Sequence, residues 1–260
     1  MSSNPRNALL SSLLGHLDPV SLCQAVGMTP DPWQRTVLRS DAPRILLCCS
    51  RQIGKSTVAG IKAVHTAVHQ PNSLTLVIAP SQRQAMLLFR SILVVYRKFG
   101  RPVAAEAENA MSLTLENGSR IVALPADQRT IRGFAAVDLI LIDEASQVDD
   151  DLYEAIRPML AVSGGQLLVM STPFGRRGWF YRATTATDDA WQRFVVPATQ
   201  CPRISPEFLL RERADLGEHR FREEYMAEFS DSSGSVFSGA DLAMILSDLP
   251  TFDLQKRLAS

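Results

Sequence analysis

The chain has 260 residues, of which 46% are hydrophobic and 21% charged, with 27 Lys and Arg against 27 Asp and Glu. This composition is typical of a folded globular domain and excludes a disordered chain. The balanced charge excludes a uniformly basic surface of the kind that indicates nucleic-acid binding. The apolar runs are far shorter than the roughly 20 residues of a membrane-spanning helix, and no signal peptide is recognisable. We therefore expect an intracellular protein that has no membrane partner.

Residues 1–30 are predicted to form a helical lead-in, because leucines recur at helical spacing between Leu9 and Leu17. From Arg44 onward, strand-like and helical segments alternate. Strands are predicted at 44–49, 74–80, 137–143 and 166–171, and helices at 56–69, 82–99 and 152–160. The dipeptide Asn117-Gly118 predicts a hairpin between 112–116 and 120–125. Strands that are apolar throughout and alternate with helices indicate a doubly wound α/β domain with a mostly parallel sheet.

A change of composition after about Trp191 predicts a second, smaller unit. One more strand at 193–198 is followed by a charged helical stretch at 206–229 and then by the Ser/Gly-rich sequence SDSSGSVFSG. We therefore divide the chain into a lead-in (1–30), a core (31–190), a small C-terminal subdomain (191–230) and a linker (231–260). The chain after residue 231 is too short to form a second catalytic domain.

The sequence LLCCSRQIGKST, residues 46–57, has the composition of a phosphate-binding loop between a strand and a helix. Such a loop needs backbone N–H groups aimed at the phosphates, a lysine for their oxygens and a hydroxyl for Mg²⁺, all at a helix N-terminus. The candidate nucleotide-binding residues are Arg51, Gln52, Ile53, Gly54, Lys55, Ser56 and Thr57. Cys49 stands where such loops usually have their first glycine. This departure weakens the match to the sequence motif, but a small side chain can still be accommodated at the start of a phosphate-binding loop. A chance Gly-Lys-Ser turn is the alternative.

A pair of acids, Asp143 and Glu144, ends the apolar segment VDLILID. Open α/β sheets bind ligands at the carboxyl ends of their strands. Asp143 is a candidate for holding Mg²⁺ together with the Ser56 hydroxyl, and Glu144 for orienting and deprotonating the attacking water. The alternative is that the two acids cap the following helix. With Lys55 earlier in the same chain, the pair predicts ATP hydrolysis.

Another strand end carries Ser171, Thr172 and Pro173, which we expect beside the same crevice. A strand end in this place can sense the γ-phosphate and relay its loss to a mobile segment. Upstream, the amide of Gln34 is able to pair with both a donor and an acceptor on an adenine edge. An ordinary strand-to-turn exit and a surface glutamine are the alternatives for these two features.

Two arginines are candidates for contacting the γ-phosphate, where a guanidinium stabilises the charge of the transition state. Arg51 lies inside the loop, and Arg132 lies in the sequence TIRGF, before Asp143. The Arg132-Gly133 pair in an exposed turn is suited to reach a neighbouring subunit. A solvated loop arginine is the alternative.

Taken together, SRQIGKST, IRGF, LILIDEAS, MSTPFGRRGWFY and EEYMAEF resemble the ATPase region of the large terminase subunit of tailed bacteriophages, the motor that packs DNA into procapsids. The resemblance runs from about Gln34 to Phe237. It implies a RecA-like (ASCE-type) P-loop NTPase fold with a small C-terminal lid subdomain at 191–230. In that family the loop reads Ser-Arg-Gln-x-Gly-Lys-Ser/Thr, so Cys49 is no departure from the family pattern.

The resemblance also implies a role for each candidate residue. It implies that Lys55 and Ser56 bind phosphates and Mg²⁺, that Asp143 binds the metal and that Glu144 is the catalytic carboxylate. It implies that Gln34 recognises adenine and that Ser171, Thr172 and Pro173 form a coupling motif. Of the two arginines, Arg51 would sense the γ-phosphate and Arg132 would act on the ATP of the next subunit. ATP and Mg²⁺ are the implied cofactors. The expected activity is Mg²⁺-dependent ATP hydrolysis that drives double-stranded viral DNA into a procapsid.

The partners that the resemblance implies are double-stranded DNA, the portal protein and the small terminase subunit. It implies that the subunits form a homo-oligomeric ring when assembled and that the isolated protein is a monomer. The expected location is the host cytoplasm, where the protein docks transiently on the procapsid. Family members usually continue into an RNase H-like nuclease domain, and the sequence GSVFSGADL resembles the junction to it. We expect 231–260 to lead toward a nuclease domain or subunit, and we expect no nuclease activity from this chain. A helicase-like or remodelling ATPase and a regulatory ATP-binding module stay open as alternatives.

Overall fold

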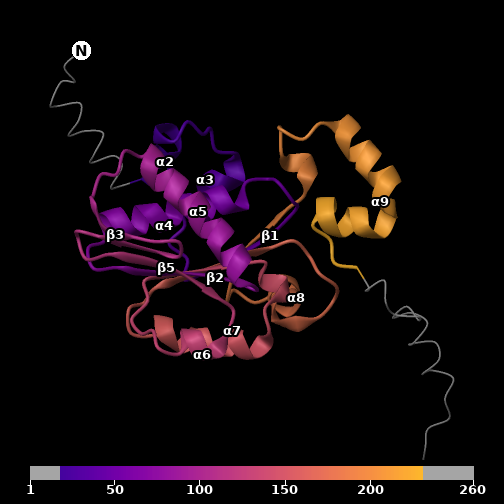
Figure 1. Ribbon diagram of the computed structural model, residues 1–260. Coiled ribbons are helices and arrows are strands. Elements are labelled where there is room, and N and C mark those ends of the chain that lie inside the picture. Colours follow the sequence, from indigo (N-terminus) through magenta and orange to yellow (C-terminus); the bar gives the residue numbers. More distant parts are fainter. Residues whose placement is uncertain (1–17, 231–260) are drawn as a thin grey trace, which may run out of the picture.

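The computed structural model describes residues 18–230 (Figure 1). The leucine-rich part of the predicted lead-in and the predicted linker at 231–260 lie outside these residues. The described part of the lead-in contains the short helix α2 (Val20–Ala25). No helix within 18–230 is long and apolar enough to cross a membrane.

The described residues form one eight-stranded sheet in the order β3-β4-β5-β2-β6-β7-β1-β8. Its strands are β1 (Arg44–Cys49), β2 (Leu74–Ala79), β3 (Ala105–Glu108), β4 (Ser112–Leu115), β5 (Arg120–Pro125), β6 (Leu139–Asp143), β7 (Gln166–Ser171) and β8 (Gln192–Val196). All neighbours from β5 to β8 in this order are parallel, while β4 and β3 extend the sheet in antiparallel fashion. This mostly parallel sheet confirms the predicted α/β class.

Helices cover both faces of the sheet because its central strands are apolar on both sides (Figure 1). Along β1, Ile45 and Leu47 pack into one core cluster and Leu46 and Cys48 into the other, as expected from the alternation of side chains along a strand. The first face carries α3 (Pro32–Arg39), α4 (Lys55–His69) and α5 (Gln82–Lys98). The second face carries α6 (Gln128–Ile131), α7 (Asp150–Ile156) and α8 (Gly178–Thr185).

The predicted hairpin at Asn117-Gly118 is confirmed, because it joins the antiparallel strands β4 and β5. Gly118 has φ 81°, and a Cβ atom there would lie 2.3 Å from Oδ1 of Asn72, so the turn requires glycine. The predicted helix at 152–160 is shorter than expected. It continues after Ile156 as a 3₁₀ turn, Arg157–Leu160, because Pro158 has no N–H for a helical hydrogen bond.

A small subdomain follows the last strand and stands apart from the layers of the sheet (Figure 1). It contains a 3₁₀ turn (Ala198–Gln200) and α9 (Pro206–Met226), which breaks at Gly217, and it packs around Ala198, Leu209 and Phe221. We call residues 198–230 the lid. The prediction also placed β8 in this unit, but β8 pairs in parallel with β1 and is therefore the edge strand of the core sheet.

Candidate active site

The predicted phosphate loop connects β1 to α4 at the carboxyl edge of the sheet. It turns through Gln52 at φ 58° and Gly54 at φ 94°. A Cβ atom on Gly54 would lie 2.7 Å from Nε2 of Gln34, so both the backbone and the space require glycine here. Cys49 is a fully buried strand residue that pairs with Val196 of β8. The turn begins only after Cys49, which is the physical reason why the usual first glycine is dispensable.

Lys55 is the first residue of α4, and its side chain bends back inside the loop. Its Nζ atom donates to the carbonyl oxygens of Ser50 at 2.7 Å and Cys49 at 3.4 Å. The lysine is buried despite its charge. The loop therefore encloses an ammonium group, as binding of a phosphate chain requires. Ser56 and Thr57 follow in the first turn of α4 and are half-buried.

The two predicted acids lie at the end of β6. Burial, and secondarily the charge of Glu144, raise the pKa of the Asp143 carboxyl to about 6, while the charge of Lys55 acts in the opposite sense. The backbone N–H of Glu144 donates to Oδ1 of Asp143 at 3.1 Å. Glu144 itself has φ 49° and ψ 43°, a left-handed conformation that is unfavourable for a residue with a Cβ atom. Strained backbone conformations cluster at functional sites, which agrees with the predicted role of Glu144.

Strand β7 lies between β1 and β6, so Ser171 at its end is placed between the loop and the acids. The Ser171 hydroxyl donates to Oε2 of Glu144 at 3.4 Å and lies 2.7 Å from Oγ of Ser146. Thr172 and Pro173 are buried directly after it. The structure thus brings the predicted coupling motif into contact with the predicted catalytic acid. The hydrogen bond between the hydroxyl groups of Ser146 and Ser171 was not predicted.

Gln34 is fully buried on the other side of the loop. Its Nε2 donates to the carbonyl oxygen of Ile53 at 3.0 Å, and its Oε1 accepts from the N–H of Asp31 at 2.8 Å. A cavity of about 840 Å³ lies beside it. The lining of this cavity includes Val26, Met28, Gln34, Thr57, Val95 and Arg203. The side chains of Asp31 and Arg203 are joined by a hydrogen bond beside this cavity. The sequence analysis did not predict this pair, because 172 residues separate its two members.

The two predicted arginines lie apart from the acids. The side chain of Arg51 is 63% exposed and forms an ion pair with Glu224 of the lid, whose carbonyl oxygen also accepts the Arg51 N–H at 3.0 Å. Arg132 follows α6, and its Nη2 donates to Oε1 of Gln128 at 2.9 Å. It lines a small surface cavity shared with α7. Arg51 therefore faces the lid, and Arg132 is exposed on the outer surface of the core.

The residues present suit a hard divalent cation such as Mg²⁺. Asp143 offers a carboxylate and Ser56 a hydroxyl, and Mg²⁺ is commonly held by one or two carboxylates together with substrate phosphates. The neighbouring charge of Glu144 makes the position of Asp143 favourable for a cation. Within 18–230 no three His, Cys, Asp or Glu side chains gather as a metal site. Phosphate oxygens and water molecules would complete the coordination.

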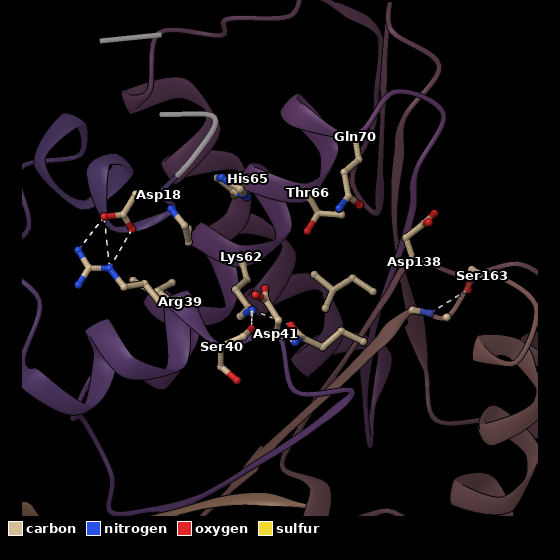
Figure 2. Close-up of a pocket in the computed structure, with 16 residues that line it drawn as sticks. Asp18, Arg39, Ser40, Asp41, Lys62, His65, Thr66, Gln70, Asp138 and Ser163 are labelled. Carbon is tan, nitrogen blue, oxygen red and sulfur yellow. Dashed lines mark hydrogen bonds and ion pairs between the residues drawn. The ribbon is translucent and has the colours of Figure 1, made fainter. Parts of the chain in front are cut away.

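A second cavity, of about 700 Å³, lies at the opposite edge of the sheet, where the strands begin (Figure 2). Lys62 is buried at this cavity, and its Nζ donates to the carbonyl oxygen of Ser40 at 3.0 Å and to Oε1 of Gln166 at 2.6 Å. Burial lowers the pKa of Lys62 to about 8, and the charge of Asp41 acts in the opposite sense. The residues that line this cavity include no predicted nucleotide-binding residue. The candidate chemistry therefore belongs to the carboxyl edge alone.

A phosphate loop on β1 and an acid pair on β6, with one strand between them, define a RecA-like P-loop ATPase domain with a C-terminal lid. This confirms the predicted fold. The chain belongs to the family described as terminase large subunit, T4likevirus-type, N-terminal, whose family model matches residues 46–244. The family predicted from the motifs is thereby confirmed as well.

Comparison with individual proteins gives the same result. The large terminase subunit of Thermus virus P23-45 is 27% identical over 86% of this chain and 53% of its own length. The ATPase domain of the large terminase of Thermus phage P74-26 matches with a TM-score of 0.70 and 26% identity, over 80% of this chain and 97% of that one. The large terminase of another thermophilic bacteriophage, solved in complex with ADP, shares the fold at 13% identity, with a TM-score of 0.62 over 77% and 54% of the two chains. The chain spans about half the length of the curated relatives that it matches.

Proposed function

We propose that this chain is the ATPase part of a DNA-packaging motor, which hydrolyses ATP with Mg²⁺ and uses the energy to move double-stranded DNA into a procapsid. The observation that carries the proposal is the convergence of Lys55, Asp143, Glu144 and Ser171 at one edge of the sheet in a chain of the terminase family. Each of these residues has a chemical task in phosphoryl transfer to water. The ADP complex of the thermophilic phage terminase supports a nucleotide as the ligand.

In this proposal Lys55 moves from the carbonyl oxygens of Ser50 and Cys49 to the β- and γ-phosphate oxygens, where its charge offsets the charge that develops in the transition state. Glu144 orients a water molecule toward the γ-phosphate and accepts its proton. The hydroxyl of Ser171 holds the Glu144 carboxylate in place for this step. Bound Mg²⁺, held by Asp143 and Ser56, would supply further charge neutralisation and align the phosphates.

The lid is suited to respond to loss of the γ-phosphate. After Ser171, the chain reaches Gly175, whose N–H donates to Oε1 of Glu223 in α9 at 3.3 Å. Arg51 pairs with the neighbouring Glu224, and in this proposal it exchanges this partner for the γ-phosphate. Both contacts support the predicted roles of Ser171-Thr172-Pro173 in coupling and of Arg51 in sensing.

The nucleobase is assigned to the cavity beside Gln34. The walls of the cavity include the apolar side chains of Val26, Met28 and Val95, which suit a purine ring. Gln34 retains a second amide hydrogen and a second lone pair on its oxygen, which are the groups that an adenine edge requires. Its two existing hydrogen bonds to the loop and to Asp31 fix the amide for that purpose.

The partners are assigned from the family. Subunits would form a ring in which exposed Arg132 reaches the ATP of the next subunit, and the ring would dock on a portal with the help of a small terminase subunit. Such a motor works in the host cytoplasm on the surface of the procapsid. The whole motor would also use a nuclease domain or subunit to cut the packaged DNA.

The central test is ATP turnover by Lys55→Ala and Glu144→Gln in the presence of Mg²⁺. Both variants are expected to lose hydrolysis, and Glu144→Gln is expected to keep its affinity for ATP. Glu116→Gln is the control, because Glu116 is an exposed acid beside the hairpin and its substitution removes one carboxylate away from the site. Substantial hydrolysis in both site variants would contradict the proposal. Stimulation of turnover by single-stranded but not duplex DNA would instead favour a helicase-like enzyme.

A further inference from the structure

Arg203 ties the beginning of the lid to the phosphate loop. It lies between β8 and α9, and its guanidinium forms two hydrogen bonds with the buried carboxylate of Asp31: Nη1 to Oδ1 at 3.0 Å and Nη2 to Oδ2 at 2.8 Å. The same Nη2 also donates to the carbonyl oxygen of Ile53 at 3.4 Å. An arginine that is distant in sequence thus contacts the backbone of the loop.

Gln34 reaches the same oxygen atom from another direction. Its Nε2 lies 3.0 Å from the Ile53 oxygen, and its Oε1 accepts the N–H of Asp31, the residue whose carboxylate holds Arg203. Two donors, one from the core and one from the lid, therefore converge on one carbonyl group. Asp31 supports both of them.

The direction of this carbonyl determines the direction of the next N–H. In a trans peptide the C=O and N–H bonds point to opposite sides. With the Ile53 oxygen held toward Gln34 and Arg203, the Gly54 N–H is directed away from these two side chains. Backbone N–H groups in such a loop are the donors that bind phosphate oxygens. The contacts of one carbonyl group therefore set the geometry of a phosphate donor.

We propose that Arg203 is a positioning residue for the nucleotide phosphates, acting through the Ile53 carbonyl and the Gly54 N–H, and that it makes phosphate affinity depend on the position of the lid. The inference rests on the proposed nucleotide-binding function of the loop. A second lid contact supports it, because the carbonyl oxygen of Glu224 accepts the N–H of Arg51 at 3.0 Å. The lid therefore holds the loop on both sides of Gln52, and a shift of the lid would reorient the peptide groups between these points.

Arg203 also lines the cavity assigned to the base, so a direct contact with adenine is the competing role. The two roles concern different parts of the nucleotide. A positioning role through Gly54 affects ligands that contain phosphate, whether or not a base is attached. A base contact affects ATP and adenosine, and leaves a bare phosphate chain unaffected.

The test compares the affinities of ATP, inorganic triphosphate and adenosine for the full chain by calorimetry with Mg²⁺ present, together with kcat and KM for ATP. Arg203→Ala is expected to weaken ATP and triphosphate binding roughly tenfold each, leave adenosine unchanged, and raise KM more than it lowers kcat. Arg203→Lys is expected to recover part of the affinity. Arg213→Ala is the matched control, because Arg213 is a lid arginine of similar exposure, 55% against 52%, that pairs with Glu218.

Triphosphate affinity equal to that of the wild type in Arg203→Ala would overturn the proposal, and weaker binding of adenosine with unchanged triphosphate binding would assign Arg203 to the base. If the wild-type chain neither binds nor hydrolyses ATP, the proposed function fails instead. Should Arg203→Ala not fold, Asp31→Asn carries the same comparison, since it weakens the support of Arg203 and retains an oxygen for capping α3.

Discussion

The hydroxyl of Ser171, the last residue of β7, donates a hydrogen bond to the carboxylate of Glu144, which directly follows the neighbouring strand β6 and lies 27 positions earlier in the sequence. The contact joins the residue predicted to couple hydrolysis to movement with the residue predicted to activate water. Because the end of β7 contacts the carboxylate of Glu144, a movement of this strand end can change the orientation of the carboxylate. Loss of the Ser171 hydroxyl should therefore affect the chemical step.

Ser171→Ala is expected to lower kcat about fivefold to tenfold with little change in KM, because the hydrogen bond orients Glu144 and does not bind the nucleotide. Steady-state ATPase kinetics measure both constants. Ser171→Thr retains the hydroxyl and is expected to stay near the wild-type rate. Unchanged kcat in Ser171→Ala would show that Glu144 is oriented without this contact.

Arg132→Ala is expected to lose hydrolysis by roughly 10³-fold while keeping its ATP affinity, because an arginine that acts on a neighbour stabilises the transition state of another subunit. Mixing Arg132→Ala with Glu144→Gln is expected to restore part of the turnover, since mixed rings contain sites with an intact acid and an intact arginine. Arg129→Ala is the control, because Arg129 is an exposed arginine of α6 close to Arg132 in the sequence. Failure of the mixture to recover activity would place the action of Arg132 within its own subunit or outside catalysis.

Glu144→Gly is expected to raise the free energy of unfolding by about 0.5–1 kcal/mol while abolishing turnover, because glycine adopts the left-handed backbone of this position without steric cost. Urea denaturation measures the change. Glu144→Ala loses the same side-chain contact with Ser171 but keeps a Cβ atom, so comparison of the alanine and glycine variants isolates the backbone effect. A Glu144→Gly variant less stable than Glu144→Ala would show that the conformation is not a source of strain.

The buried Lys62 predicts a rise in stability at alkaline pH. Its pKa is about 8 in the folded chain, whereas an unfolded lysine keeps its proton up to about pH 10.4. Between these values the unfolded chain binds more protons, so the free energy of unfolding increases from about pH 8 to about pH 10.5, by roughly 3 kcal/mol for this residue. In Lys62→Met this increase is expected to disappear. Urea denaturation of both chains at intervals from about pH 7 to about pH 10 measures the difference, and parallel curves would contradict the prediction.

The central strands, the helices α4, α5 and α7 and the carboxyl-edge motifs were predictable because each is encoded in a short, continuous run of sequence, whereas the short helices α3, α6 and α8 were not predicted. Lys55 and Asp143 follow apolar strands, and their order along the chain is sufficient to bring them to one edge. The strand β3 was missed because its sequence, AEAE, is exposed and lacks an apolar pattern. β8 was assigned to the wrong unit because only its pairing with β1 shows where it belongs.

The contacts that hold the loop were not predictable for a different reason. The pairs Arg203–Asp31 and Arg51–Glu224 join residues that only the folded chain brings together. Arg51 was singled out from its place in the loop, but nothing in the sequence identifies its partner. Gln34 was singled out for its amide. Its contact with Ile53 depends on the turn of the loop, which no pattern in the sequence encodes.

The position of β7 between β1 and β6 has a consequence for the size of the ligand. Neighbouring strands lie about 4.8 Å apart, so the strand that carries the phosphate loop and the strand that carries the acids are separated by about 10 Å. In the proposed binding mode, the phosphate chain would extend from Lys55 across the end of β7 toward Glu144. A nucleotide that has lost its γ-phosphate would then lack the group nearest to the acid, so the strand between loop and acid would contribute to the difference between substrate and product.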